Sequence, residues 1–534
     1  MYGLPLLPRA DGIAKQTTIR FGGYNHTLGA CDGDIWDMQN LTSDHYPVLS
    51  PRGPRYLIRT VESPNGLFCK DGVYYVAGTG FYKDGVQKGT VTSGKKQITA
   101  LGAYIIIFPD KKIYNVLTDT FSGMESSYSG SVQIKNGTYA EESAEANTIK
   151  ASGVSWADWF NVGDAVTISG CATHPENNLT IIIREIDGDE LRFYENSFVI
   201  NEGGDTETVT IARSVPDMDF ICENENRLWG CRGDTIYASK LGDPFNWNVF
   251  DGISTDSYAV NVGSAGDFTA CCSFLGYPVF FKEESIYKVY GSKPGNFQVM
   301  GSASLGVETG SDKSLAIAGE TLFYLSRAGI VAYSGGIPQS IAAPFGIERY
   351  KNAVGGSDGV KYYVSMQDAS GAYTLFVFDT RRNLWHREDA TQTVGFGWDG
   401  ELYMLTAAGD LNVIGNVRET PAGATQEAAV QSFVEFADFY ESSRYSTAHG
   451  ANKKGTGKIQ IRMELDANSS ATVYIKFDSE ESWTEVASVT TNVKRSWYLP
   501  IIPRRSDHFR IKIAGTGDWK LYSLSRESYF GSEL

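Results

Sequence analysis

The chain has 534 residues, several times the usual size of a domain, so we expect about two to four domains. Its 42% hydrophobic and 13% aromatic residues are enough for real cores, and 57 Gly against 17 Pro is typical of many short strands joined by glycine turns. The net charge of −16 argues against a protein that wraps nucleic acid by neutralising phosphates.

The cysteines and the apolar runs indicate where the chain is made. Seven cysteines without a CxxC pair favour a reducing compartment. The start is charged too early for a secretory signal, and the longest apolar run, residues 103–108, is too short to cross a bilayer. We therefore expect a cytosolic chain without a membrane-spanning segment.

A unit of strand, glycine turn and second strand recurs along the chain. Successive copies lie 31, 124, 51, 43, 39 and 41 residues apart, and propeller blades are roughly 40–50 residues long. The pattern predicts an all-β fold with a β-propeller of about six to eight blades, and the alternative is a run of hairpins in unrelated sandwiches. The markers of the copies are Tyr74, Ile105, Trp229, Phe280, Phe323, Tyr362 and Tyr403.

The long gap of 124 residues predicts an insertion. Removing about 85 residues, 131–215, brings the gap back to the period, and stretches such as 160–170 alternate with period two. This small β-domain carries 5 Lys/Arg and 14 Asp/Glu. Its acidity indicates either a solubilised appendage or a surface that faces DNA or a partner.

After the last blade the sequence predicts a linker and then a β-sandwich with cleanly alternating strands. The sandwich has 14 Lys/Arg against 13 Asp/Glu, a neutral tail beside an acidic body, which hints at contact between copies. The first 52 residues have too few strands for a core, so we expect neighbouring copies to order them and their removal to leave folded monomers. The predicted divisions are an extended assembly segment (1–52), first blades (53–130), the inserted domain (131–215), remaining blades (216–418), a linker (419–430) and the sandwich (431–534).

We find no pattern that specifies catalysis, a cofactor or a metal. There is no GxSxG, HExxH or phosphate-binding loop, and the six histidines (26, 45, 174, 386, 449 and 508) lack metal-ligand spacing. Cys271 and Cys272 are adjacent on a strand, so they face opposite ways and cannot chelate together. The acidic turns at 31–34 and 187–190 lack a full Ca²⁺ loop, and residues 477–483 only faintly resemble an Asp-box. We therefore assign no catalytic, cofactor-binding or metal-binding residue and predict a protein that is not an enzyme.

Several motifs resemble the tail hub or nozzle proteins of short-tailed bacteriophages, a family also described as stabilising packaged DNA. The middle of the chain carries the strongest match, in which NRLWG is followed by a loop with an Asp-Pro-x-Asn-Trp turn. The matching segments are residues 21–26, 34–44, 46–52, 226–230, 236–247, 500–505 and 509–513.

The resemblance implies a structural virion component. In such a tail, a homo-oligomeric ring, expected to be a hexamer, lies below the portal and adaptor proteins, continues the DNA ejection channel and supports fibre or spike proteins. It implies that DNA passes through the lumen without specific binding, which suits an acidic wall. It also implies a virion tail localisation after assembly in the host bacterial cytoplasm.

Two other classes stay open. A carbohydrate-binding or glycan-degrading propeller would need convergent carboxylates or aromatic platforms at one propeller mouth. A cellular scaffold would share the fold without any role in a particle.

Overall fold

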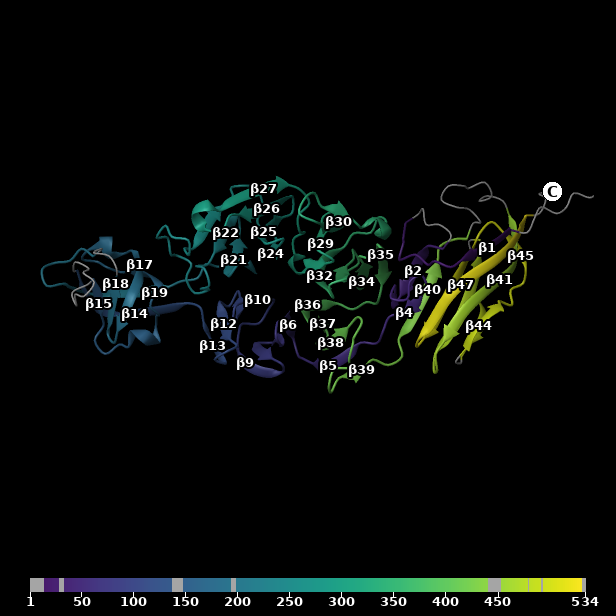
Figure 1. Cartoon of the computed structure of the whole chain (residues 1–534), viewed down its shortest axis with the longest axis horizontal. Helices are drawn as coiled ribbons and strands as arrows, with labels where there is room; N and C mark the ends of the chain where they lie inside the picture. Colours follow the sequence, from purple (N-terminus) through teal and green to yellow (C-terminus); the bar gives the residue numbers. More distant parts are fainter. Residues whose placement is uncertain are drawn as a thin grey trace, which may run out of the picture. The chain divides into compact units, whose positions relative to one another are not determined.

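The computed structural model describes residues 14–27, 33–136, 147–193, 198–439, 453–478, 480–490 and 493–530. Over these residues the chain forms 47 strands and five short 3-10 helices, with no α-helix (Figure 1). It divides into two units, residues 65–312 (unit 2) and residues 1–64 with 313–534 (unit 1). Across the described ranges, no helix has the length and apolar character needed to cross a bilayer. The predicted all-β class is confirmed.

Unit 2 contains four antiparallel sheets of four strands that follow one another in sequence, as propeller blades do. Glycines such as Gly102 (φ 57°) and Gly276 (φ 79°) make the hairpin turns, because they adopt positive φ without strain. The sheets are β6 (Pro64–Cys69), β7 (Val73–Ala77), β8 (Gly80–Lys83) and β9 (Val86–Thr90); β10 (Gln97–Leu101), β11 (Tyr104–Phe108), β12 (Lys112–Asn115) and β13 (Thr120–Gly123); β20 (Phe220–Asn224), β21 (Arg227–Arg232), β22 (Thr235–Ala238) and β23 (Tyr258–Asn261); and β24 (Ala270–Phe274), β25 (Tyr277–Lys282), β26 (Ser285–Tyr290) and β27 (Gln298–Ala303), followed by η3 (Pro294–Asn296) between the last two strands and η4 (Asp312–Ser314) at the end of the unit.

The inserted domain is a closed barrel between the second and third sheets of unit 2. It spans 126–213, where the sequence predicts 131–215, and its first and last strands pair with Ser126 opposite Arg213. The two chain crossings to the blades are therefore neighbours about 5 Å apart. The strand order is β14 (Ser126–Lys135), β15 (Thr148–Lys150), β18 (Glu190–Phe193), β17 (Thr180–Asp187), β16 (Ala165–Ser169) and β19 (Asp205–Arg213), with η1 (Trp156–Asp158) and η2 (Pro175–Asn177) in its loops.

Unit 1 contains three more blade sheets. The last of them is completed by β5 from the start of the chain, which pairs with β38 more than 340 residues later. The sheets are β28 (Ala316–Ala318), β29 (Thr321–Ser326), β30 (Gly329–Tyr333) and β31 (Gln339–Ser340), followed by η5 (Ala343–Phe345); β32 (Lys351–Ser357), β33 (Lys361–Gln367), β34 (Tyr373–Asp379) and β35 (Leu384–Arg387); and β36 (Thr393–Asp399), β37 (Glu401–Thr406), β38 (Asp410–Ile414), β5 (Tyr56–Thr60) and β39 (Thr425–Gln426).

The described chain thus holds seven blade sheets, within the expected number of about six to eight. In each unit, buried side chains of successive sheets pack together, for example Tyr74 and Phe81 against Ile105 and Tyr114. All seven marker residues lie on the second strand of a sheet. Six of them are buried, whereas Tyr403 is half-buried between the buried Leu402 and Met404.

The sandwich consists of two five-stranded sheets, and the amino terminus supplies a strand to each (Figure 1). Residues 14–18 and 35–39 are thus ordered by their own chain, where the sequence led us to expect neighbouring copies. β39 likewise lies in the stretch expected to be a linker. One sheet is β1 (Ala14–Thr18), β47 (Trp519–Phe530), β41 (Lys454–Leu465) and β44 (Val493–Tyr498) with β45 (Arg504–Ser506) beside β41; the other is β2 (Ile35–Gln39), β40 (Gln431–Phe436), β46 (Phe509–Thr516), β42 (Ser470–Phe477) and β43 (Thr484–Val489); a short hairpin pairs β3 (Leu41–Thr42) with β4 (Ser50–Pro51).

Candidate functional site

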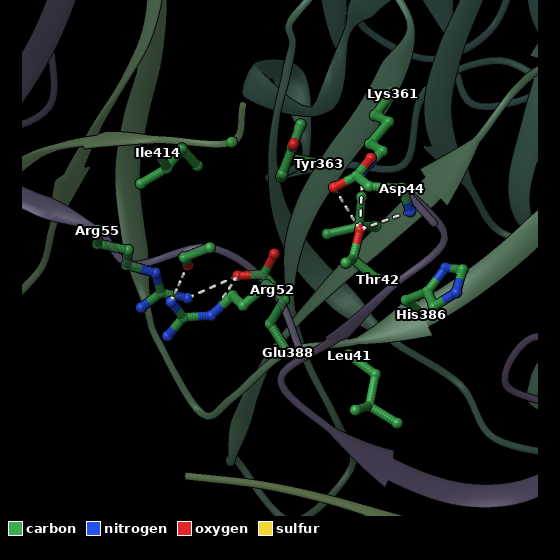
Figure 2. A pocket seen from close by; sticks show the side chains of 13 residues that line it. Leu41, Thr42, Asp44, Arg52, Arg55, Lys361, Tyr363, His386, Glu388 and Ile414 are labelled. Atoms are coloured by element: carbon green, nitrogen blue, oxygen red, sulfur yellow. Dashed lines mark hydrogen bonds and ion pairs between the residues drawn. The ribbon is translucent and has the colours of Figure 1, made fainter. Parts of the chain in front are cut away.

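The densest group of buried charged side chains lies in unit 1, where residues 41–55 cross the last two blade sheets. We call these residues the strap. Figure 2 shows that the strap's polar side chains point toward side chains from β33, β35 and the loop after β35. A small cavity in this group is lined by Leu41, Thr42, Asp44, Arg52, Gly53, Arg55, Lys361, Tyr363, Val377, His386, Glu388, Ile414 and Gly415.

Two arginines of the strap form one half of the group. Arg52 donates to both carboxylate oxygens of Glu427 at 2.7 and 2.9 Å, and its Nε donates to Asn40 at 3.0 Å. Arg55 pairs with Glu388 at 2.7 Å and with Asp389 at 2.8 Å. Burial acts to raise the pKa of Asp389 and of Glu427, but the guanidinium groups outweigh it and hold each pKa below its usual value. These carboxylates are therefore ionised at neutral pH.

A lysine and an aspartate form the other half. The Lys361 ammonium donates to Asp44 at 2.5 Å and to Thr42 at 3.0 Å. Burial acts to raise the pKa of Asp44, yet Lys361 and its other donors lower it overall. Next to this pair, the fully buried Asp379 accepts from Ser43 at 2.6 Å and from Arg382 at 2.8 Å.

His386 lies beside Lys361 and is 3% exposed. Burial, and then the Lys361 charge, lower the pKa of His386 from 6.5 to about 4, against the opposing effect of Asp379 and Asp44. His386 is therefore a neutral, structural side chain at physiological pH, in the role that the sequence favoured for the histidines.

The geometry of this group suits anchoring rather than catalysis. The cavity has a volume of about 20 Å³, enough for about one water molecule, whereas small-molecule sites span roughly 300–1,000 Å³. The carboxylates of Asp44, Glu388, Asp389 and Glu427 all pair with a lysine or an arginine. The group fastens the strap to the blades, and the cavity at its centre is too small for a substrate.

The Asp-Pro-x-Asn-Trp turn also has a structural role. Asn246 donates to Asp243 at 2.6 Å and to Asp164 of the barrel at 3.0 Å, and it accepts from the Ala165 N–H at 2.8 Å. The buried Trp247 donates to the Pro244 carbonyl at 2.8 Å. The turn therefore ties the inserted barrel to the blade sheet β20–β23.

The described carboxylates of the two acidic turns contact lysine, arginine or asparagine side chains. Asp187 pairs with Arg192 at 2.6 Å, while Asp189 and Glu190 contact Lys150 at 3.3 and 3.0 Å, so each of these carboxylates has a cation partner within the barrel. Of the turn at 31–34, Cys31 and Asp32 lie outside the described residues. Asp34 accepts from Asn25 at 3.1 Å.

The other described histidines contact polar or aromatic neighbours. His26 lies beside Trp36 and Tyr24, with ring centroids 4.1 and 5.8 Å away, and His45 lies 3.1 Å from the Ser50 hydroxyl. His174 lies 3.5 Å from Asp205, and His449 falls outside the described residues.

The structure brings together one group of metal-ligating residue types that the sequence analysis did not identify. The ligand atoms of Asp478, Asp507 and His508 lie within 4.8 Å of one another. Asp507 donates its N–H to Asp478 at 2.9 Å, and His508 Nδ1 lies 2.8 Å from the Asp507 carboxylate. Asp478 lies 29 positions before Asp507, and its only sequence signal was the Asp-box-like stretch at 477–483.

The paired cysteines are part of the blade core. Cys271 packs with Cys222, Trp229 and Cys231 between the sheets β20–β23 and β24–β27. Burial raises the pKa of the Cys271 thiol well above its usual value, so it is not a reactive thiolate.

Larger clefts are also present. A cleft of about 570 Å³ in unit 1 borders the strap, and its walls include Arg55, Gln392, Asp410, Asn412, Gln426 and Glu427. A cleft of about 610 Å³ in unit 2, which we call the acidic cleft, is different in character. Its walls include Asp219, Phe220, Asp267, Phe268, Lys282, Glu283 and Glu284.

No family model and no curated protein matches the chain. Among solved structures it is similar to Raptor from Chaetomium thermophilum, with 11% identity, a TM-score of 0.32 and coverage of 68% of this chain but only 30% of the Raptor chain. An exo-β-1,3-galactanase from Phanerochaete chrysosporium matches with 9% identity, a TM-score of 0.22 and coverage of 58% and 95%. A sialidase from Trypanosoma rangeli matches with 10% identity, a TM-score of 0.21 and coverage of 95% of both chains. Likenesses of this strength assign neither a family nor an activity.

Proposed function

We propose that the chain is a non-enzymatic structural component of a bacteriophage tail, a nozzle or hub subunit that assembles with other copies. The observation that carries the proposal is that residues of the motifs shared with tail proteins make structural contacts. Arg52 and Asn40 anchor the strap, and Asn246 anchors the barrel, all through saturated polar contacts. Residues that hold architecture together are what the resemblance to tail proteins leads us to expect.

The proposed setting is a cyclic homo-oligomer below the portal and adaptor, with DNA passing through its lumen and fibres or spikes attached outside. The net charge of −16 per copy supports this setting. Multiplied round a ring, it repels phosphates over about one Debye length, roughly 8 Å at physiological salt.

The test has two parts. Negative-stain images of the purified protein should show rings with an axial hole, and mass spectrometry of particles from the host should detect the chain. A filter assay at about 150 mM salt should show no appreciable duplex binding, because the net charge of −16 per copy repels phosphates. Tight, salt-sensitive DNA binding, or absence of the chain from purified particles, would refute the proposal.

The acidic cleft favours a second candidate function, a carbohydrate-binding or glycan-degrading propeller. Four carboxylates and the half-buried Phe220 share its walls, and hydrolysis of a glycan requires two convergent carboxylates. The galactanase and sialidase likenesses point in the same direction, but their TM-scores are too low to carry it.

A glycan array and a reducing-sugar assay on host polysaccharide separate the two candidates. The tail proposal expects no turnover. Turnover that disappears in both Glu283→Gln and Asp267→Asn, and persists in Gln392→Ala of the other cleft, would put the glycan-degrading function first.

A further inference from the structure

One outer face of the sandwich has a regular pattern of charge. In the sheet β1-β47-β41-β44, Ile459, Ile461, Met463 and Leu465 point into the core, so their neighbours on β41 point outward. We call the outward side the basic face. The register places its residues in rows across the sheet: Lys15, Glu527 and Lys458; Thr17, Ser525, Gln460 and Tyr498; Ser523, Arg462 and Ser496; and Lys520, Glu464 and Lys494.

The rows leave a surplus of positive charge. Glu527 is shared by Lys15 at 2.8 Å and Lys458 at 3.8 Å, and Glu464 lies between Lys520 and Lys494. Arg462 has only serines in its row. Five cations against two carboxylates give a net charge of about +3 on a face of four strands.

Two tyrosines give this face an apolar component. Tyr498 is 57% exposed with Lys458 5.7 Å from its ring centroid. Arg462 and Lys494 lie 5.4 and 5.3 Å from the ring of Tyr522. Tyrosine and arginine are enriched among the residues that dominate binding energy at protein interfaces, and the surplus of cations favours an acidic partner.

An acidic hairpin is present on the same chain. The β17–β18 hairpin of the inserted barrel carries Glu185, Asp187, Asp189 and Glu190 beside three cations, Arg184 and Arg192 on the hairpin and Lys150 on β15, which leaves it a net negative charge. Asp187 and Glu185 are 61% and 47% exposed. Outside 431–534 the chain carries 33 Lys/Arg and 50 Asp/Glu, so most of the surface that a second copy could offer to the basic face is acidic.

We propose that the basic face of one copy binds the β17–β18 hairpin of a second copy. The two surfaces differ, so the contact is heterologous, and its repetition builds a closed ring or an open filament. The proposal deepens the assembly part of the proposed function. If rings form and the charge variants described below assemble as the wild type does, the proposed contact is refuted, but the homo-oligomeric ring is not.

The experiment compares charge variants by sedimentation and mass photometry. The face variant carries Lys458→Gln, Arg462→Gln and Lys494→Gln, which removes charge without placing carboxylates opposite Glu464. The hairpin variant carries Glu185→Lys and Asp187→Lys. We expect at least a tenfold weaker assembly in the face variant, and weaker assembly of the wild type at about 500 mM than at about 50 mM salt, because screening shortens from about 14 to about 4 Å.

Matched changes keep the result interpretable. Lys476→Gln with Lys512→Gln neutralises cations on the other sandwich sheet and should leave assembly unchanged, with circular dichroism melts reporting folding in every variant. A stronger face variant with Glu in place of the three cations should co-assemble with the hairpin variant, although neither assembles alone. A monomeric wild type, or a folded face variant that assembles as the wild type does, overturns the proposal. Loss of heparin binding with unchanged assembly would instead mark the face as a polyanion site.

Discussion

Replacing Arg52 with Met removes the central cation of the strap while keeping most of its volume. In the native chain the side chain is 7% exposed and donates to Glu427 and to Asn40. After the change, the Asn40 oxygen has lost its charged donor. Glu427 keeps only the N–H of Arg55, at 2.9 Å.

The expected cost follows from burial. Breaking a buried ion pair by removing one partner costs about 3–5 kcal/mol, and Arg55 still compensates Glu388 and Asp389. Glu427 is 34% exposed, so water recovers part of its solvation. We therefore expect a loss near the lower limit, about 3 kcal/mol.

Hydrogen exchange measures this loss locally, since peptides covering residues 36–57 report opening of the strap. A cost of about 3 kcal/mol lowers their protection roughly 150-fold. The control Arg387→Met removes the more exposed pair with Asp37 and should cost about 1 kcal/mol or less. If Arg52→Met lowers protection by less than about fivefold, the strap is not held by buried charge.

Three further changes test other parts of the structure. The pKa of His386 is about 4 when folded and 6.5 when unfolded, so only the unfolded chain gains the proton between these values. Stability should therefore fall by up to about 3 kcal/mol from pH 6.5 to pH 4, and a urea titration of His386→Leu should lack this component. Phe323→Ala, at a buried marker, should cost about 3–5 kcal/mol, whereas the half-buried Tyr403→Ala should cost clearly less; equal losses in denaturation would contradict the register. Replacing residues 126–213 with a short Gly/Ser linker should leave the blade sheets folded, because Ser126 and Arg213 lie opposite each other where the chain enters and leaves the barrel. Loss of the cooperative thermal transition in this variant would show that the blades need the barrel in order to fold.

The propeller could be predicted because each blade repeats local information. A glycine turn and an alternating strand lie within a few residues of markers such as Trp229 and Phe280, so periodicity alone finds them. The repeat does not specify which residue of a strand is most buried: Tyr403 is half-buried between the buried Leu402 and Met404, because alternation cannot choose between adjacent apolar positions.

The strap could not be assembled from the sequence for the opposite reason. Arg52 lies more than 300 residues before Lys361 and Glu427, and each of the three alone looks like a solvated charge. The only local signal was the motif at residues 46–52, which contains Arg52 but does not indicate the residues that pair with it. Buried ion pairs across such distances become visible only when the fold brings the residues together.

The pairing of the amino terminus changes how its removal should be interpreted. β1 and β2 are edge strands of the two sandwich sheets, so deleting residues 1–50 exposes the backbones of β47 and β40. Such open edges pair with other chains, and a truncated protein that fails to form rings could fail through aggregation alone. Point changes on the basic face leave every strand in place, so they separate a contact between copies from the integrity of the sandwich. For this reason the charge variants, rather than a truncation, decide whether the sandwich mediates assembly.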